Sequence, residues 1–454
     1  MSYPVYGEYK TSSIEWLGDV PKHWEVLSIK RLTPVQRGAS PRPIEDPKYF
    51  DDDGEYAWVR IADVTSNDHY LTDSTQRLSD LGKSLSVPLE PGTLFLSIAG
   101  SVGKPMITAI KACIHDGFVH FPHLQINPEF LYYIFDSGQP YLGLGKLGTQ
   151  LNLNTDTVGG IKIGLPPKEE QDAIATFLDW KTGQIDALID KKKELLGKLK
   201  EKRLAVITQA VTKGLDPTVA MRDSGIPWLG DVPKHWEVLP IKHLLTAILD
   251  TEHKTCPYYD DGEFLVARTP NIRDGKLTLD GAKYTDAAGY QEWTARGIPK
   301  PGDILFTREA PAGEACIVPD EPQLCIGQRV VLFRTDPQIL ESRYAIYSIY
   351  GGAARNFIEM HSLGSTVTHF NMSEIAMIPM LAPPIDEQIS IAEYLDKQAS
   401  KIDQMMSKVE SAIARLTEYR SALITAATTG KIDVRDWQNP ARKGKRVSLS
   451  LAPS

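Results

Sequence analysis

Residues 16–27 read WLGDVPKHWEVL, and residues 228–239 repeat these twelve letters without a change. A second signature follows each copy, PPKEEQ at residues 166–171 and PPIDEQ at residues 383–388. The order along the chain is therefore A–B–A′–B′, and each A–B unit takes up roughly half of the 454 residues. A long internal repeat decides the architecture before any single residue does. We predict two copies of one module with pseudo-two-fold symmetry.

The composition indicates a folded protein with more than one core. Hydrophobic residues make up 42% of the chain and charged residues 24%, and 454 residues suffice for about two to four domains. No apolar run approaches the ~20 residues that span a bilayer, and residues 1–13 lack the apolar core of a signal peptide. We therefore expect a cytoplasmic protein with no membrane contact. The four cysteines lack the spacing of a disulfide framework or a zinc site, and we expect no metal.

The A units, residues 14–165 and 226–382, contain short β-favouring runs separated by Gly, Pro and Asp. One helix is expected at residues 128–136 (PEFLYYIFD), and RYAIYSIY at residues 343–350 takes its place in the second unit. This alternation predicts a mixed, strand-rich α+β fold for each unit. The expected strands of the first unit include residues 56–61, 93–98, 117–121 and 161–163.

The B segments, residues 166–213 and 383–430, have the pattern of long coiled-coil helices. Apolar residues recur every seven positions, and no proline follows the first turn of either segment. The predicted seam comprises Leu178, Ile185, Leu188, Leu195 and Leu199 in the first helix, and Leu395, Ile402, Met405, Val409, Leu416 and Leu423 in the second.

Chain order would make the two helices antiparallel if they pair with each other, with one A domain at either end of a rod. The alternative is that each B segment folds as two ordinary amphipathic helices against its own A domain. Residues 214–225 are expected to form a linker, and residues 431–454 a polar tail.

These motifs together resemble the specificity subunits of type I restriction–modification systems, over essentially all of residues 14–435. The resemblance is carried by WLGDVPKHWEV twice, the helix starts LPPKEEQ and APPIDEQ, and the DGEY and DGEF strands. The segments Gly148-Thr149-Gln150 and Gly364-Ser365-Thr366, which precede the helix starts, also fit the family pattern.

The resemblance implies that the A units are target recognition domains, each of which reads one half of an asymmetric bipartite site in double-stranded DNA. The helices would set the gap between the halves and dock two methyltransferase subunits, and restriction subunits would join this core. The chain would be a non-catalytic recognition subunit with no cofactor of its own, because S-adenosylmethionine, ATP and Mg²⁺ would be bound by other subunits. The residues agree, since the chain contains neither an Asn/Asp-Pro-Pro-aromatic tetrapeptide nor a G-x-x-x-x-G-K-[ST] loop.

Candidate DNA contacts are polar residues in the predicted loops, because Arg or Lys reads guanine and Asn or Gln reads adenine in the major groove. Arg60 and Arg268 occupy matching positions, so a scaffold role and a DNA contact stay equally open for them. Lys104 and Arg308 lie in or beside Gly-rich turns, where a backbone could approach a phosphate. The predicted contacts are Arg37, Arg42, Arg60, Lys104, Lys146, Thr149, Gln150, Arg268, Asn271, Arg273, Arg308, His361, Thr366 and His369.

The repeated tryptophans, Trp16 and Trp24 with Trp228 and Trp236, are identical in both copies. Residues that read unlike half-sites need not be identical. We therefore predict that these motifs anchor the start of each A domain to the helix ends or to a methyltransferase subunit.

The net charge of −8 argues against a protein that holds DNA alone, because such proteins are usually basic. It favours an alternative function, a non-catalytic coiled-coil adaptor with duplicated protein-binding domains. The charge is compatible with DNA recognition if methyltransferase subunits supply much of the phosphate contact.

Overall fold

The computed structural model divides the chain into two compact units. It describes residues 3–142, 144, 153–252, 254–362 and 369–440. Unit 1 consists of Met1–Lys192 and Ser411–Ser454, and unit 2 consists of Lys193–Glu410. The predicted mixed α+β class and the internal repeat are confirmed.

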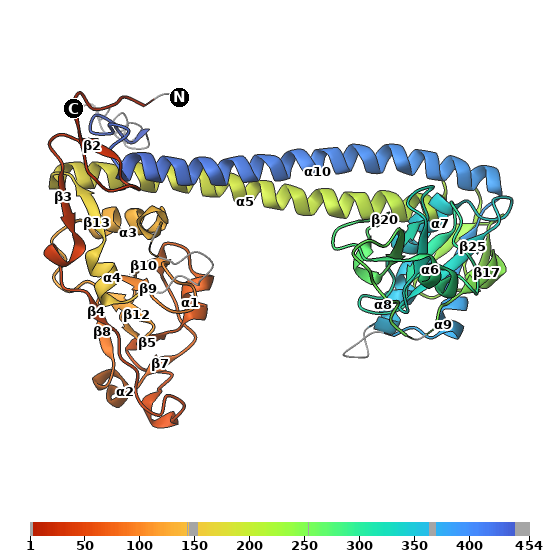
Figure 1. Cartoon of the computed structure of the whole chain (residues 1–454), viewed down its shortest axis with the longest axis horizontal. Coiled ribbons are helices and arrows are strands. Elements are labelled where there is room, and N and C mark those ends of the chain that lie inside the picture. Colours follow the sequence, from red (N-terminus) through yellow and green to blue (C-terminus); the bar gives the residue numbers. More distant parts are fainter. Residues whose placement is uncertain (1–2, 143, 145–152, 253, 363–368, 441–454) are drawn as a thin grey trace, which may run out of the picture. The chain divides into compact units, whose positions relative to one another are not determined.

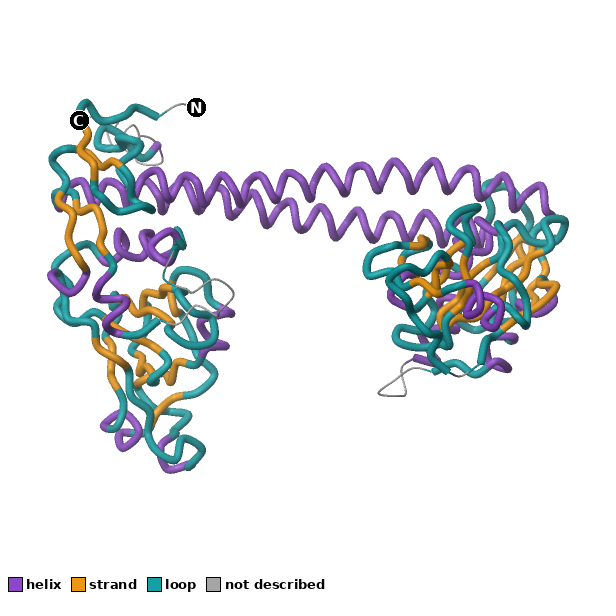
Figure 2. The backbone as a smooth tube through the Cα atoms, in the orientation of Figure 1, coloured by secondary structure: helices purple, strands orange, loops and turns teal. Residues whose placement is uncertain are grey.

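Two sheets form the globular domain of unit 1 (Figure 2). The first has the strand order β4-β12-β9-β10-β6, and the second the order β7-β5-β11-β8. Ala57 and Ile114 of the second sheet share one buried core with Phe95 and Phe118 of the first, which packs the sheets together. The strands are β4 (Gln36–Arg37), β5 (Tyr56–Val59), β6 (Tyr70–Leu71), β7 (Arg77–Leu78), β8 (Val87–Leu89), β9 (Leu94–Ser97), β10 (Pro105–Thr108), β11 (Ala112–Ile114) and β12 (Phe118–His120).

Unit 2 repeats this arrangement with a four-stranded sheet, β17-β25-β22-β23, and a three-stranded sheet, β21-β18-β24. In both units the second sheet contains one parallel pair, β5 with β11 and β18 with β24. The strands are β17 (Leu245–Leu249), β18 (Phe264–Ala267), β21 (Tyr284–Thr285), β22 (Ile304–Thr307), β23 (Ala315–Ile317), β24 (Leu324–Ile326) and β25 (Val330–Thr335), with a hairpin of β19 (Ile272–Arg273) and β20 (Lys276–Leu277).

The predicted helix at residues 128–136 is confirmed as α3 (Pro128–Asp136), and α7 (Ser342–Gly351) is its counterpart. Alternate residues of β9 explain why α3 lies on the outer face of its sheet: Leu94 and Leu96 belong to the core that contains α3, whereas Phe95 faces the other sheet. The remaining short helices are α1 (Ile61–Ser66), α2 (Asp80–Ser84), α4 (Thr155–Gly160), α6 (Ala287–Trp293), α8 (Ala353–Ser362) and α9 (Met372–Ala376).

Short antiparallel strand pairs frame each domain. The repeated motif supplies one strand to each of two pairs per unit, and it is not one continuous strand.

Two of these strands lie outside the predicted A units. The residues expected to be a linker, 214–225, contain β14, and β1 precedes the predicted start of the first A unit. These three-residue strands are too short for a periodic signal. The pairs are β1 (Tyr9–Thr11) with β2 (Asp19–Pro21), β3 (Glu25–Ser28) with β13 (Lys162–Leu165), β14 (Met221–Asp223) with β15 (Asp231–Pro233), and β16 (Glu237–Pro240) with β26 (Pro379–Ala382).

Each B segment is a single continuous helix, α5 (Lys168–Lys213) and α10 (Ile385–Thr428), and not the alternative pair of shorter helices. Within each unit, a half of α5 lies beside a half of α10 (Figure 1). None of the helices in the described residues has the length and apolarity that a membrane crossing requires.

One cross-helix ion pair occurs in both units. Arg420 of α10 contacts Asp186 of α5 at 2.9 Å in unit 1, and Arg203 of α5 contacts Asp403 of α10 at 2.9 Å in unit 2. Each residue lies 217 positions from its counterpart, so the repeat extends to the contacts between the helices. In unit 1, Arg420 also contacts Asp136 of α3 at 3.0 Å, which ties the helix pair to the globular domain.

The first row of the predicted seam is buried, but the second row was assigned one residue too early. Seven of the eight first-row residues are at most 9% exposed, and Leu416 is half-buried. Leu188, Leu195 and Met405 are 44%, 45% and 53% exposed. The residues that follow them, Ile189, Leu196 and Met406, are buried or half-buried. The first-row residues are Leu178, Ile185, Leu199, Leu395, Ile402, Val409, Leu416 and Leu423.

Helix geometry explains this correction. A residue four positions after a seam residue is displaced by about 40° around a straight helix, whereas a residue three positions on is displaced by about 60° the other way. The fourth position is therefore nearer to the seam. Apolar residues occupy both positions here, so their identity alone could not decide between them.

We expect Ile189→Ala to lower the free energy of unfolding of unit 1 by about 2–4 kcal/mol, because it removes a buried side chain from the seam. The neighbouring substitution Leu188→Ala should change it by less than about 0.5 kcal/mol. Urea unfolding of the two variants measures the difference. Equal losses would mean that Leu188 belongs to the seam after all.

Candidate nucleic-acid interface

The repeated tryptophan motif is bound to a buried carboxylate in unit 1. Glu170, in the first turn of α5, accepts a hydrogen bond from the Trp24 indole at 2.8 Å and contacts His23 Nε2 at 2.8 Å. The Tyr6 hydroxyl donates to the same carboxylate at 2.5 Å. The Glu170 side chain is only 5% exposed, so its charge is stabilised by these donors and by the helix N-terminus. We name Trp24, His23 and Glu170 the unit 1 anchor.

Unit 2 contains the same anchor. Glu387, 217 residues after Glu170, accepts from the Trp236 indole at 3.1 Å and contacts His235 at 2.8 Å. The predicted anchoring of these motifs to helix ends is thus confirmed for Trp24 and Trp236. Trp16 is half-buried against the unit 1 core, whereas Trp228 is 39% exposed.

A glycine that ends the other long helix completes each anchor. Gly430, after α10, lies against Trp24 in unit 1, and Gly214, after α5, lies against Trp236 in unit 2. Both have left-handed φ angles, +70° and +77°, and an added Cβ would lie 2.3 Å from Pro21 or 3.2 Å from Glu387. Each anchor therefore joins the start of one helix to the end of the other, which requires the two helices to be antiparallel within each unit.

The glutamine after each anchor glutamate attaches the globular domain. Gln171 accepts from the Asn127 backbone amide at 2.9 Å, and Gln388 accepts from that of Glu341 at 3.0 Å. Asn127 and Glu341 are the N-caps of α3 and α7. The Glu-Gln pair of the PPxxEQ signature thus fixes the strand motif and the domain helix to the same turn of the long helix.

A second contact holds each domain to its long helix. Tyr133 of α3 donates to Asp179 of α5 at 2.7 Å, and Tyr347 of α7 donates to Asp396 of α10 at 2.8 Å. In unit 2 Arg343 adds an ion pair to Asp396 at 2.8 Å.

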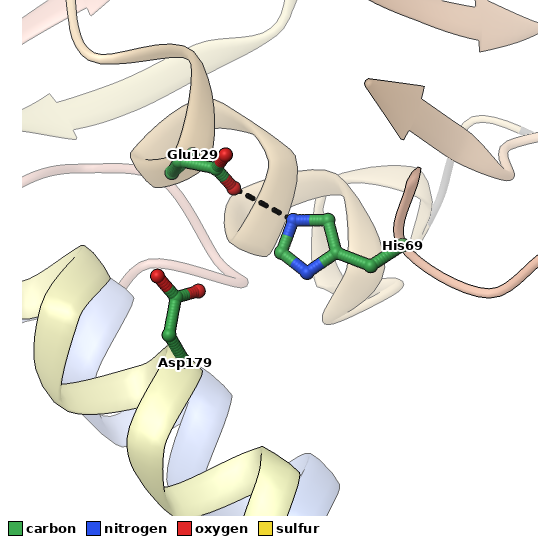
Figure 3. Close-up of side chains that lie close together, drawn as sticks. All are labelled: His69, Glu129 and Asp179. Carbon is green, nitrogen blue, oxygen red and sulfur yellow. Dashed lines mark hydrogen bonds and ion pairs between the residues drawn. The ribbon is translucent and has the colours of Figure 1, made fainter. Parts of the chain in front are cut away.

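In unit 1 the position of that arginine is occupied by Glu129, and His69 stands near both carboxylates (Figure 3). His69 Nε2 lies 2.6 Å from Glu129, and its ring stacks on Tyr132 at 3.7 Å between centroids. Burial and the nearby Glu129 raise the pKa of the Asp179 carboxyl. The ligand atoms of His69, Glu129 and Asp179 lie within 4.8 Å of one another, but hydrogen bonds already occupy all three side chains. The cluster is explained as a junction between domain and helix.

Arg60 and Arg268 lie at matching positions, after β5 and β18, and both begin a short helix. The Arg60 amide donates to the side chain of Asp63 at 2.7 Å, and the Arg268 amide donates to that of Asn271 at 3.3 Å. The Arg60 side chain is exposed. The Arg268 side chain donates to the carbonyl of Gly281 at 2.6 Å and lies over the Tyr258 ring.

Two predicted DNA contacts are structural residues. Asn271 is 0% exposed and donates to the carbonyls of Thr278 and Asp280. Arg308 is 4% exposed and lies 2.9 Å from His369. The loops fold back and cover both side chains, which disfavours the predicted DNA contacts of Asn271 and Arg308.

The other predicted DNA contacts differ in exposure and in the hydrogen bonds that their side chains already make. Lys104 is half-buried and donates to the Asn67 carbonyl at 2.8 Å. Arg273, His361 and His369 are exposed, as are Arg37 and Arg42, which the structure brings together at Asp116. Lys146, Thr149, Gln150 and Thr366 lie outside the described residues.

Comparison of the two loops after the parallel strands reveals residues that the sequence analysis missed. His115-Asp116-Gly117 follows β11, and Gly327-Gln328-Arg329 follows β24. Three polar or small residues directly after a buried strand were the available signal. The two copies have no identical residue at matching positions there, so the repeat does not mark this loop.

The comparisons with known proteins agree with this duplicated architecture. Residues 21–200 and 233–413 both match the family described as the type I restriction modification DNA specificity domain. The chain belongs to this family, and it is the specificity subunit of a type I restriction–modification system.

The similarity to individual relatives is low but extends over nearly the whole chain. The MjaIX specificity subunit of Methanocaldococcus jannaschii is 28% identical over 94% of this chain and 97% of its own length. The EcoKI specificity subunit of Escherichia coli K12 is 22% identical over 93% and 92%. A solved structure from a study of complex assembly and conformational transition of the type I system has a TM-score of 0.67 at 15% identity, over 90% of this chain and 98% of that chain. This last likeness concerns the fold.

We expect Glu170→Ala to destabilise unit 1 by about 3 kcal/mol, because it leaves buried donors without an acceptor. The matched substitution Glu387→Ala should cost unit 2 only about 1 kcal/mol, since Glu387 is 28% exposed and water can replace it. Hydrogen–deuterium exchange of the motif strands in each variant measures the two losses separately. A loss at Glu387 as large as that at Glu170 would contradict the burial argument.

Proposed function

We propose that each globular domain reads one half of an asymmetric, bipartite site in double-stranded DNA. The observation that carries this is the combination of one repeated frame with unlike loops. The anchors, the glutamine contacts and the cross-helix ion pairs recur residue for residue. The segment after Arg60 is helix α1, whereas the segment after Arg268 leads into the β19–β20 hairpin. Two equal supports with unlike reading surfaces suit two unlike half-sites.

The two long helices would set the gap between the half-sites and dock two methyltransferase subunits, and restriction subunits would join this assembly. Regular spacing of two reading elements by protein structure is how other DNA-binding proteins fix half-site separation. Methyltransferase subunits would also compensate the net charge of −8 by contributing contacts to phosphates.

The chain itself would perform no chemistry. S-adenosylmethionine would be bound by the methyltransferase subunits, and ATP and Mg²⁺ by the restriction subunits. The complex would act on the DNA of the cytoplasm.

The first test is co-expression with the partner methyltransferase subunits, followed by single-molecule sequencing of methylated host DNA. We expect methyl-adenines within one motif of two short blocks around a fixed, unspecified gap. A stable complex that methylates no such motif would favour the coiled-coil adaptor instead.

The strand pairs provide boundaries for a domain exchange. Leu27 of β3 pairs with Ile163 of β13, and Leu239 of β16 pairs with Met380 of β26. Residues 29–161 or 241–378 can therefore be replaced without cutting either anchor. We expect each exchange, with a domain from a relative, to change one block of the methylated motif and leave the other block and the gap unaltered. A change in both blocks after a single exchange would contradict the proposed division.

A further inference from the structure

The loops that follow the parallel strand pairs occupy equivalent places in the two domains. Cys113 of β11 pairs with Trp58 of β5, and Cys325 of β24 pairs with Val266 of β18. These registers align the loops that follow, so Asp116 of unit 1 corresponds to Gln328 of unit 2.

In unit 1 this loop carries a carboxylate that is bound by neighbouring side chains. Asp116 accepts from the Ser40 hydroxyl at 3.0 Å and pairs with Arg42 at 3.0 Å, and its backbone carbonyl accepts from Arg37 Nε. Although partial burial opposes it, the Ser40 hydrogen bond and the Arg42 charge hold the pKa of the Asp116 carboxyl below its usual value. Arg37 and Arg42 are thus engaged by Asp116, whereas Arg60, the counterpart of Arg268, is exposed.

In unit 2 the equivalent loop lines an open pocket of about 270 Å³, with a neutral glutamine in place of the aspartate. Arg268, Arg329, Thr255, Thr269 and Gln328 contribute donors to its lining. None of its lining residues in the described part of the chain is an Asp or a Glu.

The two arginines of the pocket keep donor capacity. Arg268 Nε is buried and has no hydrogen-bond partner among the described groups, while the other end of its guanidinium donates to Gly281. The side chain of Arg329 is 48% exposed and reaches Glu309 only at 3.7 Å. The exposed Arg329 guanidinium can contact an incoming anion, and the positive charge of Arg268 in the same pocket would add to the attraction.

We infer that this pocket binds a backbone phosphate of DNA beside the half-site read by unit 2, and that Asp116 is the internal substitute for that phosphate in unit 1. This inference rests on the proposed function. Arginine and threonine side chains are common donors to DNA phosphates, and such contacts position a protein without reading sequence. The two domains would therefore hold DNA differently, with a stronger phosphate contact at this loop in unit 2.

The test compares Gln328→Asp with Gln328→Asn in the complete complex with methyltransferase subunits, on a duplex that carries the methylated motif. The aspartate would copy unit 1 and neutralise the pocket, whereas the asparagine has the same shape without the charge. We expect Gln328→Asp to weaken binding by about tenfold at moderate salt and to reduce the slope of log K against log salt by about one. Gln328→Asn should bind like the natural protein.

Two further variants serve as controls for a general charge effect and for misfolding. Gln338→Asp adds the same charge at an exposed site of unit 2 and should leave binding unchanged. If Gln328→Asp fails to fold, Arg329→Gln provides the test instead, and we expect it to show the same loss of affinity and the same smaller salt slope.

Equal binding and equal salt slopes for Gln328→Asp and Gln328→Asn would overturn the inference. An unchanged slope with an altered base preference would also overturn it, since it would mean that the pocket reads a base edge. If the natural complex shows no sequence-selective binding, the proposed function itself fails. Measuring the natural complex first separates this outcome from a failure of the pocket inference alone.

Discussion

Each unit is joined by one carboxylate at the start of a long helix, which is buried in unit 1 and partly exposed in unit 2. Glu170 and Glu387 collect the indole and imidazole donors of the repeated motif, and their glutamine neighbours collect a domain helix. The Glu170 carboxylate has little contact with water, and such a charge is stable only when several hydrogen-bond donors surround it. The donors come from segments that are distant in the chain, so their hydrogen bonds to the carboxylate hold these segments together. This requirement accounts for the repeated His-Trp pair within WLGDVPKHWEVL, which supplies donors to the carboxylate in both units.

The anchors leave the distal loops free to vary. The domain sheets are attached to the helices through α3 or α7 and through one strand pair, and none of these contacts involves the loops after the parallel strands. Substitutions in those loops therefore do not disturb the attachment. The loop at Asp116 and the pocket at Gln328 show how far the two copies have diverged on one frame. This separation of support and reading surface suits the proposed recognition of two unlike half-sites.

Local patterns predicted the elements that have strong periodicity. The helix at residues 128–136 and the two long helices follow from the spacing of their apolar residues, and the duplicated motifs indicated the repeat and the family. The strands β1 and β14 were not predicted, because a strand of three residues is too short to show an alternating apolar pattern. The second seam row was misplaced because Leu188 and Ile189 are equally apolar, and only the packing of the helices shows which one is buried.

The sequence by itself determined the two-copy architecture, the antiparallel order expected of the helices and membership of the specificity-subunit family, because these depend on repeats and periodicities that are local in the chain. Only the tertiary structure decided which polar residues are free to contact DNA. Arg308 and Asn271 look like loop readers in the sequence, but they are buried by contacts with distant residues. No local pattern marks Gln328 and Arg329, which the strand registers place beside Arg268. The availability of a charged side chain depends on partners brought close by folding, and no local pattern records them.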